Sequence, residues 1–257
     1  MKKQHKILRT GLKVLFNVTS MINYCVLSSK LACSTTQIFS DLRLNRNPGD
    51  YTGWRIRYDR ISSFDKQTLM KEMHFVDDFL HIYPKGYQAW NYRRCLAVIN
   101  RNWGKELQLT ADLLSDQSGD PKNYHAWSYR QWVLNHITAA EVWEREDIFV
   151  RTHLEGDVRN NAAWNHRWFV FHSKVIPEQF IIKEIEYVFQ MIQKVQENKS
   201  AWSYLTGILT HDLHLIADDT EKEKCFELVI SNAKKLKEKN SLLAIEFLRE
   251  FETKQWC

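Results

Sequence analysis

The stretch Pro121-Lys-Asn-Tyr-His-Ala-Trp-Ser-Tyr-Arg-Gln-Trp132 is one of several copies of the same short pattern. Each copy has a tryptophan near its centre, and most copies have an arginine three residues later. Successive tryptophans are 36, 37, 37 and 38 residues apart, at Trp54, Trp90, Trp127, Trp164 and Trp202. Self-similarity at a period of about 20 to 50 residues indicates a repeat protein, in which each repeat is one supersecondary unit.

Each repeat combines two predicted helices. One carries the Trp-x-x-Arg pattern, and the other is amphipathic and contains a basic–acidic step: Lys71-Glu72, Lys105-Glu106, Arg145-Glu146 and Lys183-Glu184. Two antiparallel helices cannot bury both of their faces alone, so consecutive repeats must stack. We therefore predict an all-α protein, a right-handed α–α superhelix of helical hairpins.

The helix starts are predicted by the residue four positions before each tryptophan. These residues all belong to the class that favours the N-cap position: Asp50, Gly86, Asn123, Asn160 and Asn198. Agreement in five copies is stronger evidence for these helix starts than a single capping pattern. It predicts that Tyr51, Tyr87, Tyr124 and Asn161 lie in the first turn of their helices.

Residues 41–257 are predicted to form the repeat domain. Its C-terminal end is an atypical cap made of two helices, over 218–239 and 242–251. Residues 1–40 differ in character and form an extension, with a basic start and a short apolar run that polar residues interrupt. This run is too short and polar to span a bilayer, so we expect no stable membrane insertion. A disordered extension, a weak helix packed on the first repeat and a targeting segment remain alternatives.

Composition excludes several classes of function. Eight glycines and four prolines favour helices over the many tight turns of a β protein. The net charge of +5 comes from mixed basic and acidic residues without a basic run, so nucleic-acid binding is not expected. Five scattered cysteines without a CxxC pair predict neither disulfides nor a zinc site, and they fit a reducing, cytoplasmic location. His211 and His214 lack a third metal ligand.

The tryptophans and arginines of the pattern are predicted to be structural. A bulky aromatic residue buries a large area at a repeat interface, and arginines such as Arg130 can donate hydrogen bonds to carbonyls or carboxylates of a neighbouring repeat. No nucleophile elbow, glycine-rich phosphate loop or HExxH motif is present. The residues therefore indicate a helical repeat protein that works through a partner.

Cations precede the predicted N-caps in the central repeats only. Lys85, Lys122 and Arg159 occupy this position, whereas the outer copies have Gly49 and Glu197. A cation is unfavourable beside the positive end of a helix dipole. In a stack, however, these cations and the free N–H groups of their helices form a row that suits a phosphate or diphosphate. The alternative is a set of solvated loop charges.

The repeats resemble the α subunit that protein farnesyltransferase shares with type I geranylgeranyltransferase. The resemblance runs from about Asp41 to Leu209 and is clearest in residues 122–133, 157–169 and 200–209. It implies a heterodimer in which this chain wraps a β subunit that is an α–α barrel. It also implies transfer of an isoprenoid from its diphosphate to the cysteine of a C-terminal CaaX peptide. The β subunit holds Zn²⁺ and the isoprenoid pocket, and Mg²⁺ assists departure of the diphosphate.

The resemblance also implies roles for single residues. Lys122 is expected to contact the diphosphate, and Tyr124 is expected to line the site beside it. Three further positions match ones that the family associates with activity or substrate binding: Arg130, Asn160 and Trp164. Gln88 is a weaker match for contact with the carboxylate of the substrate peptide. No metal ligand is expected in this chain.

Two other functions fit the same repeats. One is the α subunit of the Rab-specific geranylgeranyltransferase, and the other is a helical scaffold without enzymatic activity. The placement of the cations in the central repeats favours an enzyme subunit, because a scaffold has no need of it. Residues 1–40 depart from the family, since they lack its segment with Tyr-Arg-Asp followed by Glu-Trp-Ala-Asp.

Overall fold

The computed structural model describes residues 29–117, 119–173 and 178–253. These ranges form α-helices and two short 3-10 helices, and they contain no strand. The Cα positions divide into two compact units, residues 1–100 and 101–257. The boundary directly follows α5, where Arg101 adopts a left-handed backbone with φ of 53°. None of the described helices combines the length and apolar character that crossing a membrane requires.

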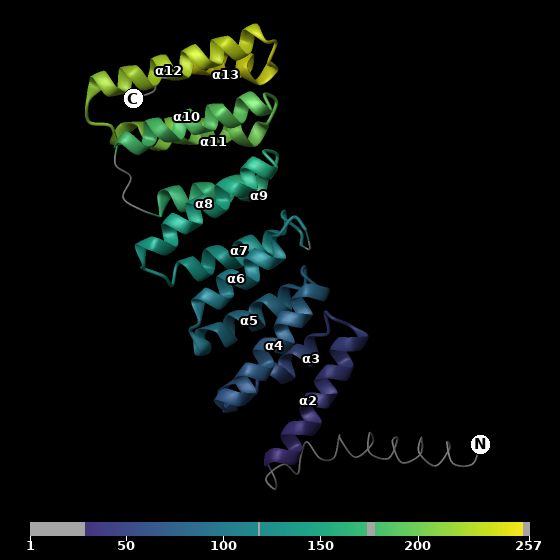
Figure 1. Cartoon of the computed structure of the whole chain (residues 1–257). Coiled ribbons are helices and arrows are strands. Elements are labelled where there is room, and N and C mark those ends of the chain that lie inside the picture. Colours follow the sequence, from purple (N-terminus) through teal and green to yellow (C-terminus); the bar gives the residue numbers. More distant parts are fainter. Residues whose placement is uncertain (1–28, 118, 174–177, 254–257) are drawn as a thin grey trace, which may run out of the picture. The chain divides into compact units, whose positions relative to one another are not determined.

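The first unit contains two helical hairpins (Figure 1). They are α2 (Ser29–Arg46) with α3 (Tyr51–Tyr58) and, after η1 (Ile61–Ser63), α4 (Lys66–Ile82) with α5 (Tyr87–Asn100). Helix α2 begins inside the segment predicted as an extension and packs on α3, where the Ser40 hydroxyl donates a hydrogen bond of 2.9 Å to the Gly53 carbonyl. The predictions for residues 1–28 lie outside the described residues.

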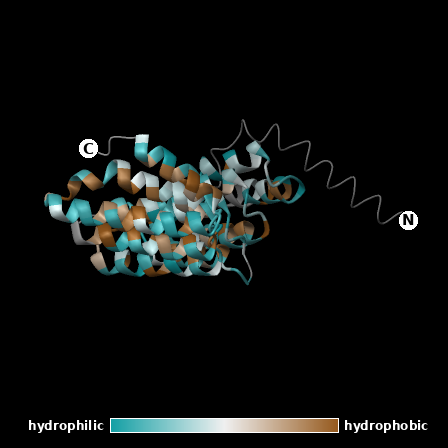
Figure 2. Ribbon diagram, turned by 90° about the horizontal axis from the view of Figure 1, so that it is seen from above, coloured by the Kyte–Doolittle hydropathy of each residue, from teal (hydrophilic) through white to brown (hydrophobic). Residues whose placement is uncertain are grey.

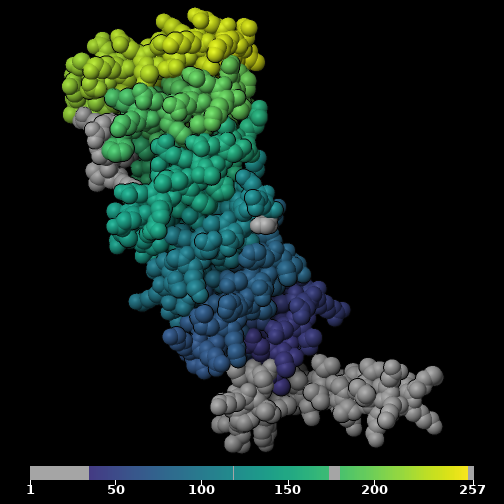
Figure 3. Space-filling model, in the orientation of Figure 1, coloured from purple at the N-terminus to yellow at the C-terminus, as the bar shows by residue number. Residues whose placement is uncertain are grey.

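The second unit contains four hairpins. They are α6 (Trp103–Leu113) with α7 (Tyr124–Leu134), α8 (Ala140–Gly156) with α9 (Asn161–His172), α10 (Glu178–Lys194) with α11 (Lys199–His211) and, after η2 (Leu213–Leu215), α12 (Asp219–Glu238) with α13 (Leu242–Thr253). Figure 3 shows this unit as contiguous bands of colour in chain order, because each hairpin packs mainly on its neighbours. The predicted all-α fold of stacked helical hairpins is confirmed, as are the two C-terminal helices.

The five repeat tryptophans form the core, as predicted. Each is at most 5% exposed, and Figure 2 shows apolar residues interspersed among polar ones along the helices. Each indole N–H donates to the carbonyl six residues earlier, at 2.7–2.9 Å, and the acceptors are Pro48, Pro84, Pro121, Val158 and Gln196. The bond satisfies the one polar atom of a buried ring. It also ties the loop before each helix to the body of that helix.

The helices begin where the N-cap pattern places them. The side chains of Asp50, Asn123, Asn160 and Asn198 accept hydrogen bonds from backbone N–H groups of the first turn. Gly86 has no side chain to do so, but its carbonyl accepts the N–H of Trp90 at 3.3 Å and α5 starts at the next residue. The helix starts are therefore confirmed in all five copies.

Buried glutamates connect consecutive repeats. The acidic residues of the four basic–acidic steps are at most 4% exposed: Glu72, Glu106, Glu146 and Glu184. Each accepts a hydrogen bond from the residue two positions after the tryptophan of its own hairpin: Tyr92, Tyr129, His166 and Tyr204, respectively. Three of these carboxylates also bind the arginine of the preceding repeat, in the pairs Arg57–Glu72, Arg130–Glu146 and Arg167–Glu184. The predicted inter-repeat role is confirmed for these three arginines, whereas Arg93 binds the Met73 carbonyl and Asp77 within its own hairpin.

Removing one of these carboxylates is expected to destabilise the second unit strongly. Glu184→Ala leaves the buried Arg167 guanidinium without its two bonds to Glu184, at 2.6 and 2.5 Å, and the Tyr204 hydroxyl without its acceptor. An uncompensated buried charge costs about 3–5 kcal/mol. Urea unfolding of the purified chain measures the loss.

The matched control is Glu186→Ala, two residues further along α10 on its exposed face. A surface substitution of this kind changes the free energy of unfolding by about 0.5 kcal/mol or less. Equal effects of the two variants would show that the buried glutamate does not join the repeats.

Candidate functional site

The loops that precede α7, α9 and α11 lie side by side along one edge of the second unit. The Asn160 side-chain amide donates to the Pro121 carbonyl at 2.8 Å, and the Asn198 amide donates to the Val158 carbonyl at 2.6 Å. The N-cap asparagine of one helix therefore also holds the loop before the preceding repeat's helix. Because these bonds are buried or partly buried, they define the spacing of the loops.

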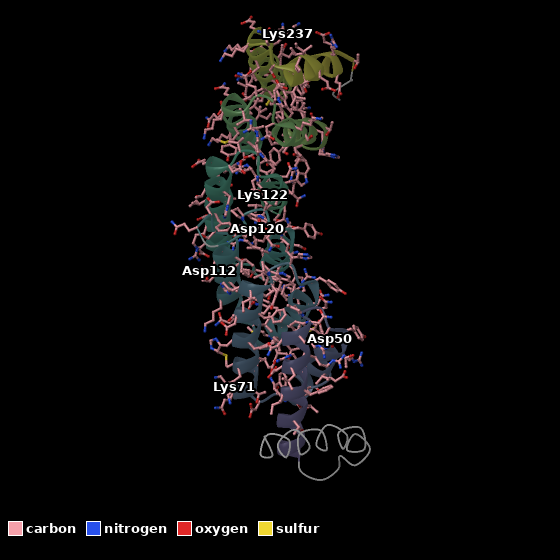
Figure 4. All side chains as sticks on the ribbon, turned by 90° about the vertical axis from the view of Figure 1, so that its right-hand side faces the viewer. Asp50, Lys71, Asp112, Asp120, Lys122 and Lys237 are labelled. Atoms are coloured by element: carbon pink, nitrogen blue, oxygen red, sulfur yellow. The ribbon has the colours of Figure 1, made fainter. Side chains whose placement is uncertain are left out.

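Lys122 makes an ion pair with the next loop. Its ammonium Nζ lies 2.8 Å from Oδ2 of Asp157, and both side chains are about half exposed, at 55% and 43%. Asp157 Oδ1 accepts the backbone N–H of Arg159 at 2.9 Å, and the Arg159 side chain is exposed. Figure 4 labels Lys122 with Asp120, from the same loop. Two cations of the predicted row, Lys122 and Arg159, are thus close to one carboxylate.

Tyr124 lies in the first turn of α7 and is 73% exposed, which suits contact with a ligand or partner. The ring of His125 packs against it edge to face, with centroids 5.7 Å apart. His125 is half-buried and lies close to the same helix start. The sequence prediction did not select His125, although its place directly after Tyr124 in the first turn of the helix was a usable signal.

The prediction that the N–H groups at these helix starts are free is wrong in part. Asn123 Oδ1 already accepts the N–H groups of His125 and Ala126, at 2.9 and 3.2 Å. Asn160 Oδ1 accepts those of Ala162 and Ala163 in the same way. N-capping therefore uses the donors that an anion needs. A ligand at this edge therefore relies more on the side chains and the helix dipole than the prediction assumed.

Arg130 lies in the core and contributes no group to this edge. Its guanidinium makes two bonds of 2.7 Å to Glu146, a third to the Leu107 carbonyl and a fourth to the Thr110 hydroxyl. Its carbon Cζ stacks 3.7 Å from the ring centre of Phe149. Every contact is structural.

His166 shares the Glu146 carboxylate with Arg130. Its Nε2 lies 2.6 Å from Glu146 Oε1, while Nδ1 is buried without a partner. Burial opposes ionisation of Glu146, but the bond from His166 and the charge of Arg130 outweigh it and lower the pKa of Glu146 to about 2. Burial lowers the pKa of His166, and Arg130 adds to the effect, against the attraction of Glu146. The imidazole is therefore neutral and donates from Nε2.

Asn160 and Trp164 are also buried, with 1% and 3% exposed. Asn160 caps α9 and bonds to the Pro121 carbonyl, and the Trp164 indole bonds to the Val158 carbonyl at 2.8 Å. Both residues position the loops that carry Lys122 and Asp157 and do not face a ligand themselves.

Gln88 belongs to the first unit, and the other predicted site residues belong to the second. Its amide donates to the Gly49 carbonyl at 3.1 Å, which connects the first turn of α5 to the loop before α3. Lys85, the remaining cation of the predicted row, precedes α5 in the same unit.

The edge of the second unit can attract an anion but supplies little else. Lys122 and Arg159 carry positive charge, and Tyr124 and His125 add a polar aromatic surface. Within the described ranges, no three His, Cys, Asp or Glu side chains are grouped to hold a metal ion. Charge stabilisation is the chemistry that these side chains can perform.

A family model described as "Protein prenyltransferase alpha subunit repeat" matches residues 69–98, 103–137 and 143–173. The protein farnesyltransferase/geranylgeranyltransferase type-1 subunit alpha of Dictyostelium discoideum is 39% identical over 69 residues, which are 26% of this chain and 21% of that protein. The corresponding subunit of Candida albicans is 32% identical over 66% of this chain and 57% of that protein. The geranylgeranyl transferase type-2 subunit alpha of Saccharomyces cerevisiae is 27% identical over 94% of this chain and 75% of that protein.

Among solved structures, the chain is similar to one from the Candida albicans protein geranylgeranyltransferase-I complexed with GGPP. The TM-score is 0.58 and the identity is 27%, over 83% of this chain and 77% of that chain. The matches to the two type-1 relatives span much less than their full length.

The Glu146 cluster predicts a pH dependence of stability. A histidine whose pKa is lowered by folding contributes stability above its unfolded pKa of about 6.5, and this contribution is lost as the pH falls below that value. His166→Tyr supplies the hydroxyl donor that Tyr92, Tyr129 and Tyr204 supply in the other repeats. Between pH 7 and pH 5 we expect the free energy of unfolding to fall less in this variant than in the unchanged protein. The difference is up to about 1.4 kcal/mol per pH unit.

Chemical denaturation at several pH values measures this difference. Glu146 is still ionised over this range, and the half-buried His153, whose pKa is also lowered by burial, is present in both proteins. Identical slopes for the two proteins would show that His166 does not gain a proton on unfolding.

Proposed function

We propose that this chain, which belongs to the protein prenyltransferase alpha subunit repeat family, is the α subunit of a heterodimeric protein prenyltransferase. The observation that supports this most directly is the register of the repeats. The three matched segments coincide with the hairpins α4–α5, α6–α7 and α8–α9, and the tryptophan of each occupies the same buried position. The partner in the proposed complex is a β subunit, and the chain is inactive without it.

The proposed substrates are an isoprenoid diphosphate and a protein that ends in a CaaX sequence. In this proposal Lys122 contacts the diphosphate, and Tyr124 lines the site beside it. As the carbon–oxygen bond of the isoprenoid breaks, negative charge grows on the diphosphate, and a nearby ammonium group stabilises it. Arg130, Asn160 and Trp164 act in this proposal as positioning residues, because all three are buried in contacts within the repeats.

We assign neither metal of the proposed complex to the side chains of this chain. Zn²⁺ belongs to the β subunit, where it lowers the pKa of the substrate thiol. Mg²⁺ is bound with the diphosphate. Asp157 is the carboxylate nearest to Lys122, and both of its oxygens already accept bonds from within the protein.

We propose the farnesyltransferase and type I geranylgeranyltransferase function in preference to the Rab-specific one. The support is the higher identity to the type-1 α subunits, 39% and 32%, together with the sequence of residues 157–169. The Rab-specific enzyme is the second candidate, because the Saccharomyces cerevisiae type-2 subunit aligns with more of the chain than either of these relatives. The choice of isoprenoid lies in the β subunit in either case.

Co-expression with a β subunit tests the proposal. With a farnesyltransferase β subunit from the same organism, we expect a heterodimer that prenylates a peptide ending in Cys-a-a-X, measured by mass spectrometry. A type-2 β subunit from the same organism is the parallel experiment. Assembly and transfer with that subunit alone would favour the second candidate, and assembly without transfer would favour a scaffold.

Lys122→Ala is expected to lower the turnover of the heterodimer about 10-fold or more while assembly is unchanged, because the variant removes charge stabilisation of the leaving group. Lys237→Ala is the matched control, since Lys237 lies on the exposed face of α12 (Figure 4). Gel filtration reports assembly, and steady-state kinetics report turnover. A parallel loss of assembly would assign Lys122 a structural role.

A further inference from the structure

Asp157 performs two different tasks with its two carboxylate oxygens. Oδ1 accepts the Arg159 backbone N–H at 2.9 Å and closes the turn before α9. Asp120 makes the equivalent turn before α7, where its Oδ1 accepts the Lys122 backbone N–H at 3.1 Å. The second oxygen of Asp157 is not needed for the turn. It binds the Lys122 ammonium at 2.8 Å.

The ion pair is one that a ligand can replace. The hydrogen bond from Lys122 lowers the pKa of Asp157, so the carboxylate carries a full negative charge at neutral pH. Both side chains remain about half exposed, and water and salt weaken ion pairs in such a setting. The pair therefore neutralises Lys122 without locking it in place.

Other donors at this helix start are also in use. Asn123 occupies the N–H groups of His125 and Ala126, so an incoming anion finds fewer backbone donors here and the Lys122 ammonium contributes more to its binding. A singly charged anion gains no more from that ammonium than Asp157 does. An anion with several negative charges and oxygens gains more, and it is also attracted by the exposed Arg159 on the next loop.

We infer that Asp157 is an internal competitor at this site: it holds Lys122 until an anion with several negative charges displaces it, and breaking the pair lowers the affinity of every anion that binds through Lys122. The inference rests on the proposed function, because it concerns the same lysine. Asp157 is a positioning residue and does not touch the reacting atoms.

The test uses Asp157→Asn in the purified heterodimer. Asparagine retains an oxygen for the Arg159 N–H but loses the charge that binds Lys122. The probes are inorganic pyrophosphate and inorganic orthophosphate, titrated by calorimetry. We expect the unchanged protein to prefer pyrophosphate, and the variant to bind both anions more tightly. The gain is expected to be about two- to fivefold for each anion, and no smaller for pyrophosphate, because Asp157 repels its higher charge more strongly.

Two further variants test whether the gain comes from the pair of Asp157 and Lys122. Asp219→Asn removes one negative charge from an aspartate that is 97% exposed on α12, and its affinities are expected to stay unchanged. The double variant Lys122→Ala/Asp157→Asn is expected to lose the gain, because the lysine is then absent. Unchanged affinities in Asp157→Asn, a gain that persists in the double variant, or no pyrophosphate binding by the unchanged protein each overturns the inference.

Prenyl transfer measured on the same samples separates this inference from the proposed function. Transfer with anion affinities that Asp157→Asn leaves unchanged keeps the function and removes the role of Asp157. A gain in anion affinity without transfer supports the role of Asp157 and removes the function. If this chain forms no heterodimer, the same titrations are performed on the full chain alone.

Discussion

The buried carboxylate of each repeat is the interaction on which the stack depends. Glu146 accepts from Arg130 of the repeat before it and from His166 of its own hairpin, and Glu184 does the same with Arg167 and Tyr204. A buried charge is tolerated only where such bonds satisfy it. Each glutamate therefore specifies how far one hairpin is displaced and rotated against the next. Apolar contacts alone would define this geometry less precisely.

The loops at the edge of the second unit are also held in defined positions. The Trp127 and Trp164 indoles bind the loops before their helices, and Asn160 and Asn198 bind the loop of the repeat before. The loops that carry Lys122 and Asp157 are thus held by buried bonds, although their own side chains are exposed. Such an arrangement suits a site that stabilises charge, since charged groups that are already in place need no reorganisation during reaction.

The sequence predicted the scaffold better than the site. Periodicity and N-caps located the helix starts because each signal recurred in five copies, and the tryptophans and arginines were correctly expected to be structural. The site predictions were less complete. Lys122 was selected without its partner Asp157, Gln88 falls in the other compact unit, and His125 was not selected. The position of a charged residue in the sequence does not show which groups neutralise its charge.

The sequence by itself determined the fold class and the starts of the repeat helices, because these follow from local residue patterns that repeat. Only the tertiary structure decided which groups pair between repeats. The partner of Lys122 lies in the next loop, the acceptor of Arg130 lies on the next helix, and Asn123 uses the N–H groups that were expected to bind an anion. These pairings depend on how the apolar faces of neighbouring hairpins pack, and spacing along the chain does not specify that packing.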